Sequence, residues 1–499
     1  MKRIITRRQA LKLGALAGGS LLLPIALQHH GDAVTSGSPQ PTPFQVKLPI
    51  PSILEPVRSD GTTDYYEIVM KKSQVEILPG LTTEIWAYNG IAPGPTIKQR
   101  KDRQSVVRFI NDLGTPTSVH LHGMASLPQY DGYAEDLIPP GYYKDYIYPN
   151  NRAATLWYHD HAIHETARNV YMGLAGMYIV QDQFELDLPL PKGEYDVPLV
   201  IQDKIFADDG SLIFDDDNHN GLMGDVILVN GAPWPKMEVA NRKYRFRVLN
   251  ASNSRAYKLA LSTGDDLIAI ATDSGLMGAP VKTKDIRIGM AERYEFIIDF
   301  SRYSIGTQVV LKNLGLRNNK DYDGTGQLVR FNVVREETDD SSIPNTLRTF
   351  QPIPESSAVR TRQWAFEHRN EMWVINGNTW DKNRVDANPG LGDIEIWRFI
   401  NNARDWFHPA HVHLVDFQIL DRNRQPPLPY ERGWKDVVYV GEDDNIRVIA
   451  RFGPHQGKYM IHCHNTVHED HDMMTQFQVG RGGPDPMSAP AQPLPAPPL

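Results

Sequence analysis

The 499-residue chain contains one cysteine, Cys463, and therefore cannot form an internal disulfide. Its stability must come from the burial of apolar side chains and not from a disulfide framework. The chain also lacks a positive net charge, since its formal charge is −8, and it has no zinc-finger, RNA-binding or polybasic pattern. These absences argue against nucleic acid or an acidic membrane surface as its partner.

The N-terminal segment MKRIITRRQALKLGALAGGSLLLPIAL combines a basic start with a short apolar run. That run is shorter than the roughly 20 residues that a membrane-spanning helix needs. TRRQALK, with Arg7 and Arg8, resembles the twin-arginine export motif. We interpret residues 1–33 as a twin-arginine signal peptide that ends near Ala33, with an ordinary Sec signal or an uncleaved anchor as the alternative. The mature protein is expected in the periplasm or outside the cell, without stable membrane association.

Three copies of one pattern divide the rest of the chain. The segments VRFIN, FRVLN and WRFIN lie at intervals of 139 and 151 residues and end at Asn111, Asn250 and Asn401. A second marker, a turn, recurs upstream at intervals of 141 and 146 residues, in YNGIAPGP, VNGAPWP and INGNTW. Two markers that repeat in step predict three related domains.

The interiors of these repeats consist of short alternating or β-branched runs, punctuated by Gly, Pro, Asn and Asp. This pattern predicts an all-β fold of three consecutive Greek-key barrels or sandwiches. We place the domains at residues 45–185, 190–335 and 363–482. A polar linker is predicted at 336–362, and a Pro-rich tail, expected to be disordered, at 483–499.

Histidines fall at matching places in the first and third domains, whereas the equivalent segments of the second have none. Four H-x-H pairs result: His120/His122, His159/His161, His411/His413 and His462/His464. Residues i and i+2 of a strand point to the same face about 6.5–7 Å apart, so each pair can bind one metal or two neighbouring metals. Because two pairs come from each outer domain, we predict a shared metal site between those domains, with the second domain as a spacer.

Cys463 lies between two histidines in HCHNTVHEDHDMM, residues 462–474. If HCH is a strand, Cys463 faces away from its neighbours and serves a second site with His408 and His468. Two histidines and a cysteine with a weak axial methionine form the ligand set of a blue, type 1 copper. Met473 is the candidate axial ligand.

Together HLHG, WYHDH, HPAHVHL and HCHNTVHEDHDMM resemble the four copper-binding motifs of the multicopper oxidases. The similarity is closest to the bilirubin oxidase and spore-coat laccase branch. Trp406 lies two residues before His408, as the corresponding tryptophan does in bilirubin oxidases. The resemblance implies three cupredoxin domains and four coppers per chain. The implied ligands are His408, Cys463, His468 and Met473 for type 1, His120 and His411 for type 2, and His122, His159, His161, His413, His462 and His464 for the type 3 pair.

In this family the type 2 copper and the type 3 pair form a trinuclear cluster. In laccases of that branch, carboxylates near this cluster help to deliver protons. Asp131 and Glu469 occupy the matching places, with an ordinary loop or strand-end carboxylate as the alternative for each. The implied reaction is one-electron oxidation of a phenol, aromatic amine or tetrapyrrole, which docks near the edge of His408 or His468. This oxidation is coupled to four-electron reduction of dioxygen to two waters. We expect the protein to be a monomer.

Three other functions remain as alternatives. A Cu(I) or metal oxidase for copper tolerance would carry a Met-rich insertion, whereas the 14 methionines of this chain are scattered. A copper nitrite reductase would have two domains per chain and lack the eight-histidine set. A non-enzymatic exported cupredoxin scaffold would have lost the histidines that this chain retains.

Overall fold

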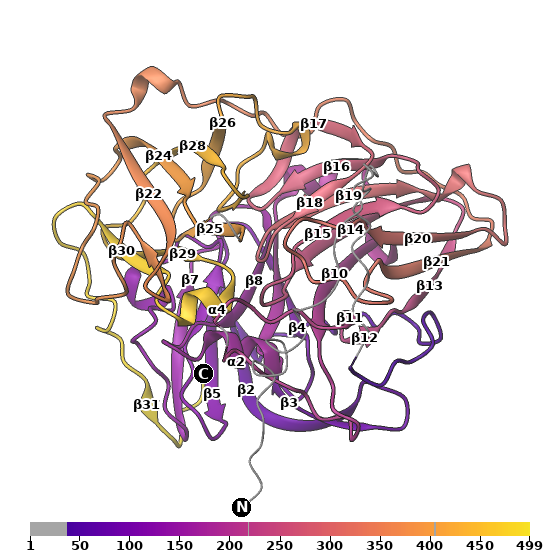
Figure 1. Ribbon diagram of the computed structural model, residues 1–499, viewed down its shortest axis with the longest axis horizontal. Coiled ribbons are helices and arrows are strands. Elements are labelled where there is room, and N and C mark those ends of the chain that lie inside the picture. Colours follow the sequence, from indigo (N-terminus) through magenta and orange to yellow (C-terminus); the bar gives the residue numbers. More distant parts are fainter. Residues whose placement is uncertain (1–36, 218, 404–405) are drawn as a thin grey trace, which may run out of the picture. The chain divides into compact units, whose positions relative to one another are not determined.

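The computed structural model describes residues 37–217, 219–403 and 406–499, so the predicted signal peptide lies outside it. Within these residues the strands form six sheets, two for each of three consecutive domains (Figure 1). The predicted all-β fold is therefore confirmed. None of the described helices is both long and apolar enough to cross a membrane.

Domain 1 consists of a six-stranded and a four-stranded sheet. The first has the order β1-β2-β5-β7-β31, with β3 paired to β2. Its strands are β1 (Arg58–Ser59), β2 (Thr63–Glu76), β3 (Thr82–Tyr88), β5 (Gln104–Asp112), β7 (Tyr142–Tyr148) and β31 (Gln492–Pro493). The second has the order β4-β9-β8-β6. Its strands are β4 (Gly94–Arg100), β6 (Val119–His122), β8 (Ala154–Asp160) and β9 (Ala175–Gln181).

Domain 2 pairs a seven-stranded sheet, β12-β11-β10-β14-β19-β16-β17, with a five-stranded sheet, β13-β21-β20-β15-β18. The larger sheet contains β10 (Asp196–Lys204), β11 (Val226–Val229), β12 (Ala232–Pro233), β14 (Lys243–Asn250), β16 (Leu267–Thr272), β17 (Gly275–Thr283) and β19 (Arg293–Asp299). The smaller contains β13 (Lys236–Ala240), β15 (Tyr257–Leu261), β18 (Ile286–Ile288), β20 (Gln308–Asn313) and β21 (Gln327–Arg335).

Domain 3 has a five-stranded sheet, β23-β22-β24-β28-β26, and a four-stranded sheet, β27-β25-β29-β30. The first contains β22 (Arg360–Arg369), β23 (Met372–Ile375), β24 (Ile394–Asn401), β26 (Phe417–Arg422) and β28 (Asn445–Arg451). The second contains β25 (His408–Val412), β27 (Val437–Val440), β29 (Gly457–Cys463) and β30 (Met474–Val479). The described helices are short: α2 (Thr166–Met172), α3 (Gln183–Asp187), α4 (Thr466–Asp470) and the 3-10 turns η1 (Pro128–Tyr130), η2 (Gly193–Tyr195), η3 (Phe300–Arg302), η4 (Glu355–Ser357) and η5 (Pro429–Glu431).

The repeated asparagine at the end of β5, β14 and β24 has the same role in each domain. Asn250 donates from Nδ2 to the carbonyls of Arg255 and Ile288, and its Oδ1 accepts from the Ser252 amide. Asn111 and Asn401 make the equivalent three bonds in their own domains. The side chain thus satisfies two backbone groups of the loop that follows each strand and one carbonyl of a later segment, which explains why the pattern repeats.

The upstream turns share a geometry as well. Asn89, Asn230 and Asn376 adopt φ values of 54°, 51° and 53°, in the left-handed region that asparagine tolerates. Each Oδ1 accepts from a main-chain amide of a neighbouring strand, at 2.8 Å in all three domains. In every domain the strand that provides this amide runs parallel to the strand that ends in the repeated asparagine.

The Pro-rich tail is ordered, so the expectation of disorder was wrong. β31 pairs antiparallel with β7, Gln492 opposite Tyr143, and the Leu494 amide donates to the Gly141 carbonyl at 3.0 Å. Proline is tolerated here because β31 lies at the sheet edge, where a missing N–H breaks no further pairing. Arg108 also donates to the Pro497 carbonyl. The tail therefore completes the first sheet of domain 1.

Candidate metal centre

Two pairs of neighbouring strands carry the predicted metal ligands. In domain 1, β6 and β8 run antiparallel and bring His120 opposite His159. In domain 3, β25 and β29 run antiparallel and bring His411 opposite His462. The other four histidines lie at, or one residue beyond, the ends of these strands: His122, His161, His413 and His464.

The eight rings meet in one buried cluster, here called the histidine cage, and each is at most 1% exposed. The rings of His120 and His413 stack with centroids 3.9 Å apart. The Nε2 atoms of His120 and His411 lie 3.4 Å apart, those of His161 and His462 3.2 Å, and those of His413 and His462 3.1 Å. Histidine side chains of the first and third domains thus lie together, as predicted, with their ring nitrogens directed toward one another.

Main-chain carbonyls determine which nitrogen carries the proton in several of these rings. Nδ1 of His120 lies 2.5 Å from the Asp131 carbonyl oxygen, and Nδ1 of His411 lies 2.8 Å from the Asp436 carbonyl oxygen. Because a carbonyl oxygen only accepts, each Nδ1 must donate, which leaves Nε2 with an unshared lone pair. The two Nε2 lone pairs face each other with no proton to join them.

The ring nitrogens of the cage are suited to bind metal ions, because they are neutral and cannot all form hydrogen bonds with one another. Burial lowers the pKa well below the usual value in His120, His122, His159, His411, His413 and His464, and to about 4 in His161. Among the described residues, Nδ1 of His122, Nε2 of His159 and both nitrogens of His464 have no hydrogen-bond partner. Neutral imidazoles with converging, unpaired nitrogens are suited to bind copper, zinc, iron or nickel.

The predicted carboxylate Asp131 joins the two halves of the cage. It is 3% exposed, and its Oδ2 accepts from Nδ1 of His413, in domain 3, at 2.7 Å. Its own carbonyl holds His120, in domain 1. Burial raises the pKa of the Asp131 carboxyl well above its usual value.

Glu469 makes the reciprocal contact from domain 3. It is 2% exposed, with Oε2 3.1 Å from Nδ1 of His462 and Oε1 3.5 Å from Nδ1 of His161. Burial raises the pKa of Glu469, but attraction to His462 and His161 outweighs burial and holds that pKa below its usual value. Both predicted carboxylates therefore contact histidines of the cage on both sides of the domain boundary.

A third carboxylate, Asp436, was missed at the sequence level. Its Oδ1 lies 2.9 Å from Nε2 of His122, and its carbonyl accepts from His411. It directly precedes β27, and nothing in GWKDVV marks it as a partner of a histidine 314 residues away. Only the assembled domains bring the two together.

A second ligand set lies on the other face of β29. Nδ1 of His408 is 3.4 Å from Sγ of Cys463, Nδ1 of His468 is 3.8 Å from the same sulfur, and the two Nδ1 atoms are 3.3 Å apart. A point equidistant from these atoms lies about 2 Å from each, close to the length of a bond between a transition metal and an imidazole nitrogen. The two-histidine, one-cysteine triangle matches the trigonal plane of a type 1 copper.

The protonation states of the side chains in this triangle also favour binding of a cation. Nε2 of His468 lies 2.7 Å from the Asn220 carbonyl and must donate to it, so Nδ1 presents a lone pair to the sulfur. Burial raises the pKa of the Cys463 thiol, and a bound metal ion would overcome this by deprotonating it. Met473, the predicted axial ligand, is fully buried in the same apolar cluster as Cys463. Its carbonyl accepts from the Cys463 amide at 3.1 Å.

Neither histidine of the triangle has an exposed edge, contrary to the expectation for substrate docking. His408 and His468 are both 0% exposed. The ring of Trp373 stacks on His468 with centroids 3.8 Å apart, and that of Trp406 approaches it edge-on at 5.3 Å. The exposed His368 in turn lies over Trp373 at 4.4 Å. Aromatic rings therefore separate this ligand set from the surface.

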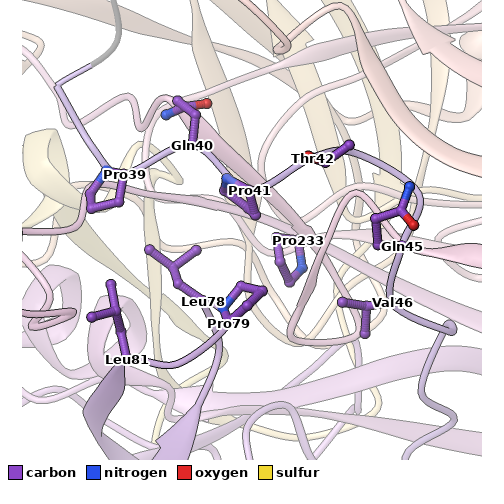
Figure 2. Close-up of a pocket in the computed structure, with 10 residues that line it drawn as sticks. All are labelled: Pro39, Gln40, Pro41, Thr42, Gln45, Val46, Leu78, Pro79, Leu81 and Pro233. Carbon is purple, nitrogen blue, oxygen red and sulfur yellow. The ribbon is translucent and has the colours of Figure 1, made fainter.

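A surface pocket of about 400 Å³ lies beside residues 39–46, and Figure 2 shows the side chains that line it. Its lining is made of Pro, Leu, Val, Gln and Thr side chains and contains no histidine, cysteine or carboxylate. It offers no metal ligand and no acid or base, so we assign no catalytic role to this pocket.

Comparisons with known proteins identify the family to which the chain belongs. Three multicopper oxidase family models match residues 69–185, 206–327 and 352–483. A bilirubin oxidase of Albifimbria verrucaria is 42% identical, over 91% of this chain and 84% of that protein. A laccase of Bacillus subtilis (strain 168) is 36% identical, over 87% and 98%. The crystal structure of the McoA multicopper oxidase from Aquifex aeolicus has a TM-score of 0.81 at 31% identity, over 87% of this chain and 99% of that one.

The fold and the two ligand sets define a copper-dependent oxidase built from three cupredoxin-like domains. The chain belongs to the multicopper oxidase family and is an oxidoreductase that uses dioxygen as electron acceptor. The predicted family and cupredoxin-like fold are thereby confirmed.

Proposed function

We propose that the protein oxidises phenols, aromatic amines or tetrapyrroles one electron at a time and passes the electrons to dioxygen through four copper ions. The proposed ligands are His408, Cys463, His468 and Met473 for a type 1 copper, His120 and His411 for a type 2 copper, and His122, His159, His161, His413, His462 and His464 for a type 3 pair. Copper bound there would supply one-electron redox chemistry at the first site and reduction of dioxygen to two waters at the second.

The continuity of the chain at residues 462–464 is the observation that carries this proposal. Cys463 contributes to the triangle, while its covalent neighbours His462 and His464 contribute to the cage. The main chain therefore provides a short bonded route between the two ligand sets. A protein that stored copper or used it for structure alone would have no need to join two sites through one thiolate.

Aromatic side chains provide the place where a substrate would give up its electrons. Since His408 and His468 are covered, we assign docking to the surface formed by His368 and the half-buried Trp406. Trp373, stacked between His368 and His468, would relay the electron inwards. The names of the two relatives described above, bilirubin oxidase and laccase, support an organic reductant.

Asp131 and Glu469 are proposed to hold and deliver the protons that dioxygen reduction consumes. Both are buried carboxylates in contact with rings of the cage, Asp131 through His413 and Glu469 through His462. The proposal is supported by their burial beside the histidine cage, where bulk water is excluded. It gives each a role beyond orienting an imidazole.

Oxygen uptake with four reductants tests the substrate class. The purified copper-loaded protein is supplied in turn with bilirubin, a methoxyphenol, an azino-type dye and Cu(I). Uptake with the organic reductants is the expected result. Uptake confined to Cu(I) would establish the alternative, a metal oxidase for copper tolerance, and copper content near zero would favour the non-enzymatic scaffold.

We also propose that the protein is exported by the twin-arginine route and acts as a monomer in the periplasm or outside the cell. Replacing Arg7 and Arg8 by lysine should retain the chain inside the cell, as measured by fractionation. Unchanged export would argue for a Sec signal. Sedimentation of the exported protein should give the mass of one chain, and a dimer mass would contradict the monomer.

A further inference from the structure

We propose that Arg293, from the domain that carries none of the predicted metal ligands, is a positioning residue for the histidine cage and acts through Asp436. This inference rests on the proposed trinuclear copper cluster. It assigns to domain 2 a part in building the oxygen-reducing site, beyond the role of spacer predicted from the sequence.

Arg293 binds Asp436 through two parallel hydrogen bonds. Nη1 donates to Oδ1 at 2.7 Å and Nη2 to Oδ2 at 2.5 Å. The same Oδ1 accepts from Nε2 of His122 at 2.9 Å, which places the proton on Nε2 and leaves Nδ1 bare inside the cage. A planar guanidinium fixes a carboxylate in two directions, so the Arg293 side chain determines where Asp436 holds the His122 ring.

Arg293 is itself held rigidly, with 0% of its surface exposed. Its Nε donates to the Thr155 carbonyl of β8, in domain 1, at 3.0 Å, and Nη1 and Nη2 donate to the carbonyls of Ala291 and Asp273. Its amide donates to the Asp273 carboxylate at 2.7 Å. Because Nε, Nη1 and Nη2 of Arg293 all donate hydrogen bonds, the side chain has one fixed position relative to domain 2 and holds Asp436 in that position.

Further ion pairs extend this contact into what we call the Asp436 junction, formed by Asp273, Glu292, Arg293, Lys435 and Asp436. Nζ of Lys435 lies 3.0 Å from Asp273 and 3.0 Å from Glu292. All five residues are at most 1% exposed. Three carboxylates face two cations, so the junction keeps one net negative charge, and a buried charge of this kind favours cations in the adjacent cage.

Gly123, which follows His122 in HLHG, shows how closely the junction approaches the cage. It has φ +92°, and a Cβ built there would lie 2.8 Å from Nη2 of Arg293 and 2.9 Å from Oδ2 of Asp436. The motif needs glycine both for this backbone conformation and to admit the ion pair beside the turn. The turn after β6 therefore packs directly against Arg293 and Asp436 of the junction.

The test compares copper retention in three variants of the full-length, copper-loaded chain. Arg293→Met removes the paired hydrogen bonds at similar volume, and Arg293→Lys keeps the charge without the planar fork. The matched control is Arg247→Met, because Arg247 is similarly buried in domain 2 and also reaches β8, where it donates to Thr155 Oγ1. Its ion-pair partners Glu185, Asp196 and Glu295 belong neither to the cage nor to the Asp436 junction. Each protein is dialysed against a graded chelator, then examined for copper content, type 2 electron paramagnetic resonance and blue absorption.

For Arg293→Met we expect copper in the cage to be held roughly 10–100-fold more weakly, with an altered type 2 resonance, while the blue absorption of the triangle persists. Copper retention in Arg293→Lys should lie between that of Arg293→Met and that of the wild type. If Arg293→Met does not fold, the comparison of Arg293→Lys with the wild type tests the inference. Arg247→Met should lower the unfolding temperature but leave both spectra and copper retention unchanged. Equal copper retention in Arg293→Lys and wild type, or equal losses in the Arg293 and Arg247 variants, would overturn the inference. Wild-type protein without a type 2 signal would instead refute the proposed function.

Discussion

Removing the Asp131 side chain separates its orienting role from its proposed role as a proton donor. Asp131→Ala leaves Nδ1 of His413, 2.7 Å from the missing Oδ2, as a buried donor without a partner. Such a group costs about 1–3 kcal/mol, and loss of an equivalent partner typically weakens metal binding roughly 10–100-fold. Asp131→Asn keeps an oxygen that can accept from His413 and removes only the charge and the transferable proton.

The assay measures copper per chain and oxygen uptake for both variants. Asp131→Ala should lose copper from the cage during dialysis against chelator. Asp131→Asn should retain it while oxygen uptake falls about a hundredfold or more, the usual contribution of a positioned proton donor. Full oxygen uptake by Asp131→Asn would refute the proton role, and wild-type copper retention by Asp131→Ala would refute the orienting role.

Three further predictions concern electron flow, folding and pH. Trp373→Leu should slow anaerobic bleaching of the blue absorption by an organic reductant about tenfold or more. Trp364→Leu, which alters a tryptophan whose ring packs on Trp397, should leave that rate unchanged. Asn250→Ala deletes three buried hydrogen bonds and should lower the free energy of unfolding by about 3 kcal/mol in denaturant titrations; a loss under 1 kcal/mol would contradict the role given to the repeated asparagine. Burial lowers the pKa of Lys204 from 10.5 to about 7, so between these values the unfolded chain holds a proton that the folded chain lacks, and stability should rise with pH. Lys204→Met should remove that contribution, and an unchanged slope of stability against pH would exclude it.

The clustering of the candidate ligands could be predicted because strand geometry is local. Alternation along a strand determines that His462 and Cys463 face opposite sides, and β29 has this arrangement. The repeated asparagines could be aligned because each one bonds to backbone within its own domain. These features need no knowledge of how distant segments pack.

What could not be predicted depends on contacts between segments that lie far apart in the sequence, some of them in different domains. Asp436 meets Arg293 across 143 residues and His122 across 314, and no spacing in the sequence encodes either pair. Trp373, on β23, stacks on His468, on α4, and these two elements of domain 3 are also far apart in the sequence. The ordered tail was missed for a different reason, since its composition favours disorder but its pairing with β7 supplies the hydrogen bonds that composition does not reveal.

Copper content and absorption of Cys463→Ser test the central claim, that one thiolate joins the site where electrons enter to the site where dioxygen is reduced. The substitution removes the sulfur from the triangle and leaves His462 and His464 in the cage. We predict loss of one copper of four, complete loss of the blue absorption and of organic-substrate oxidation, and retention of the type 2 resonance. A Cys463→Ser protein that remains blue, or that still couples substrate oxidation to oxygen uptake, would contradict the account.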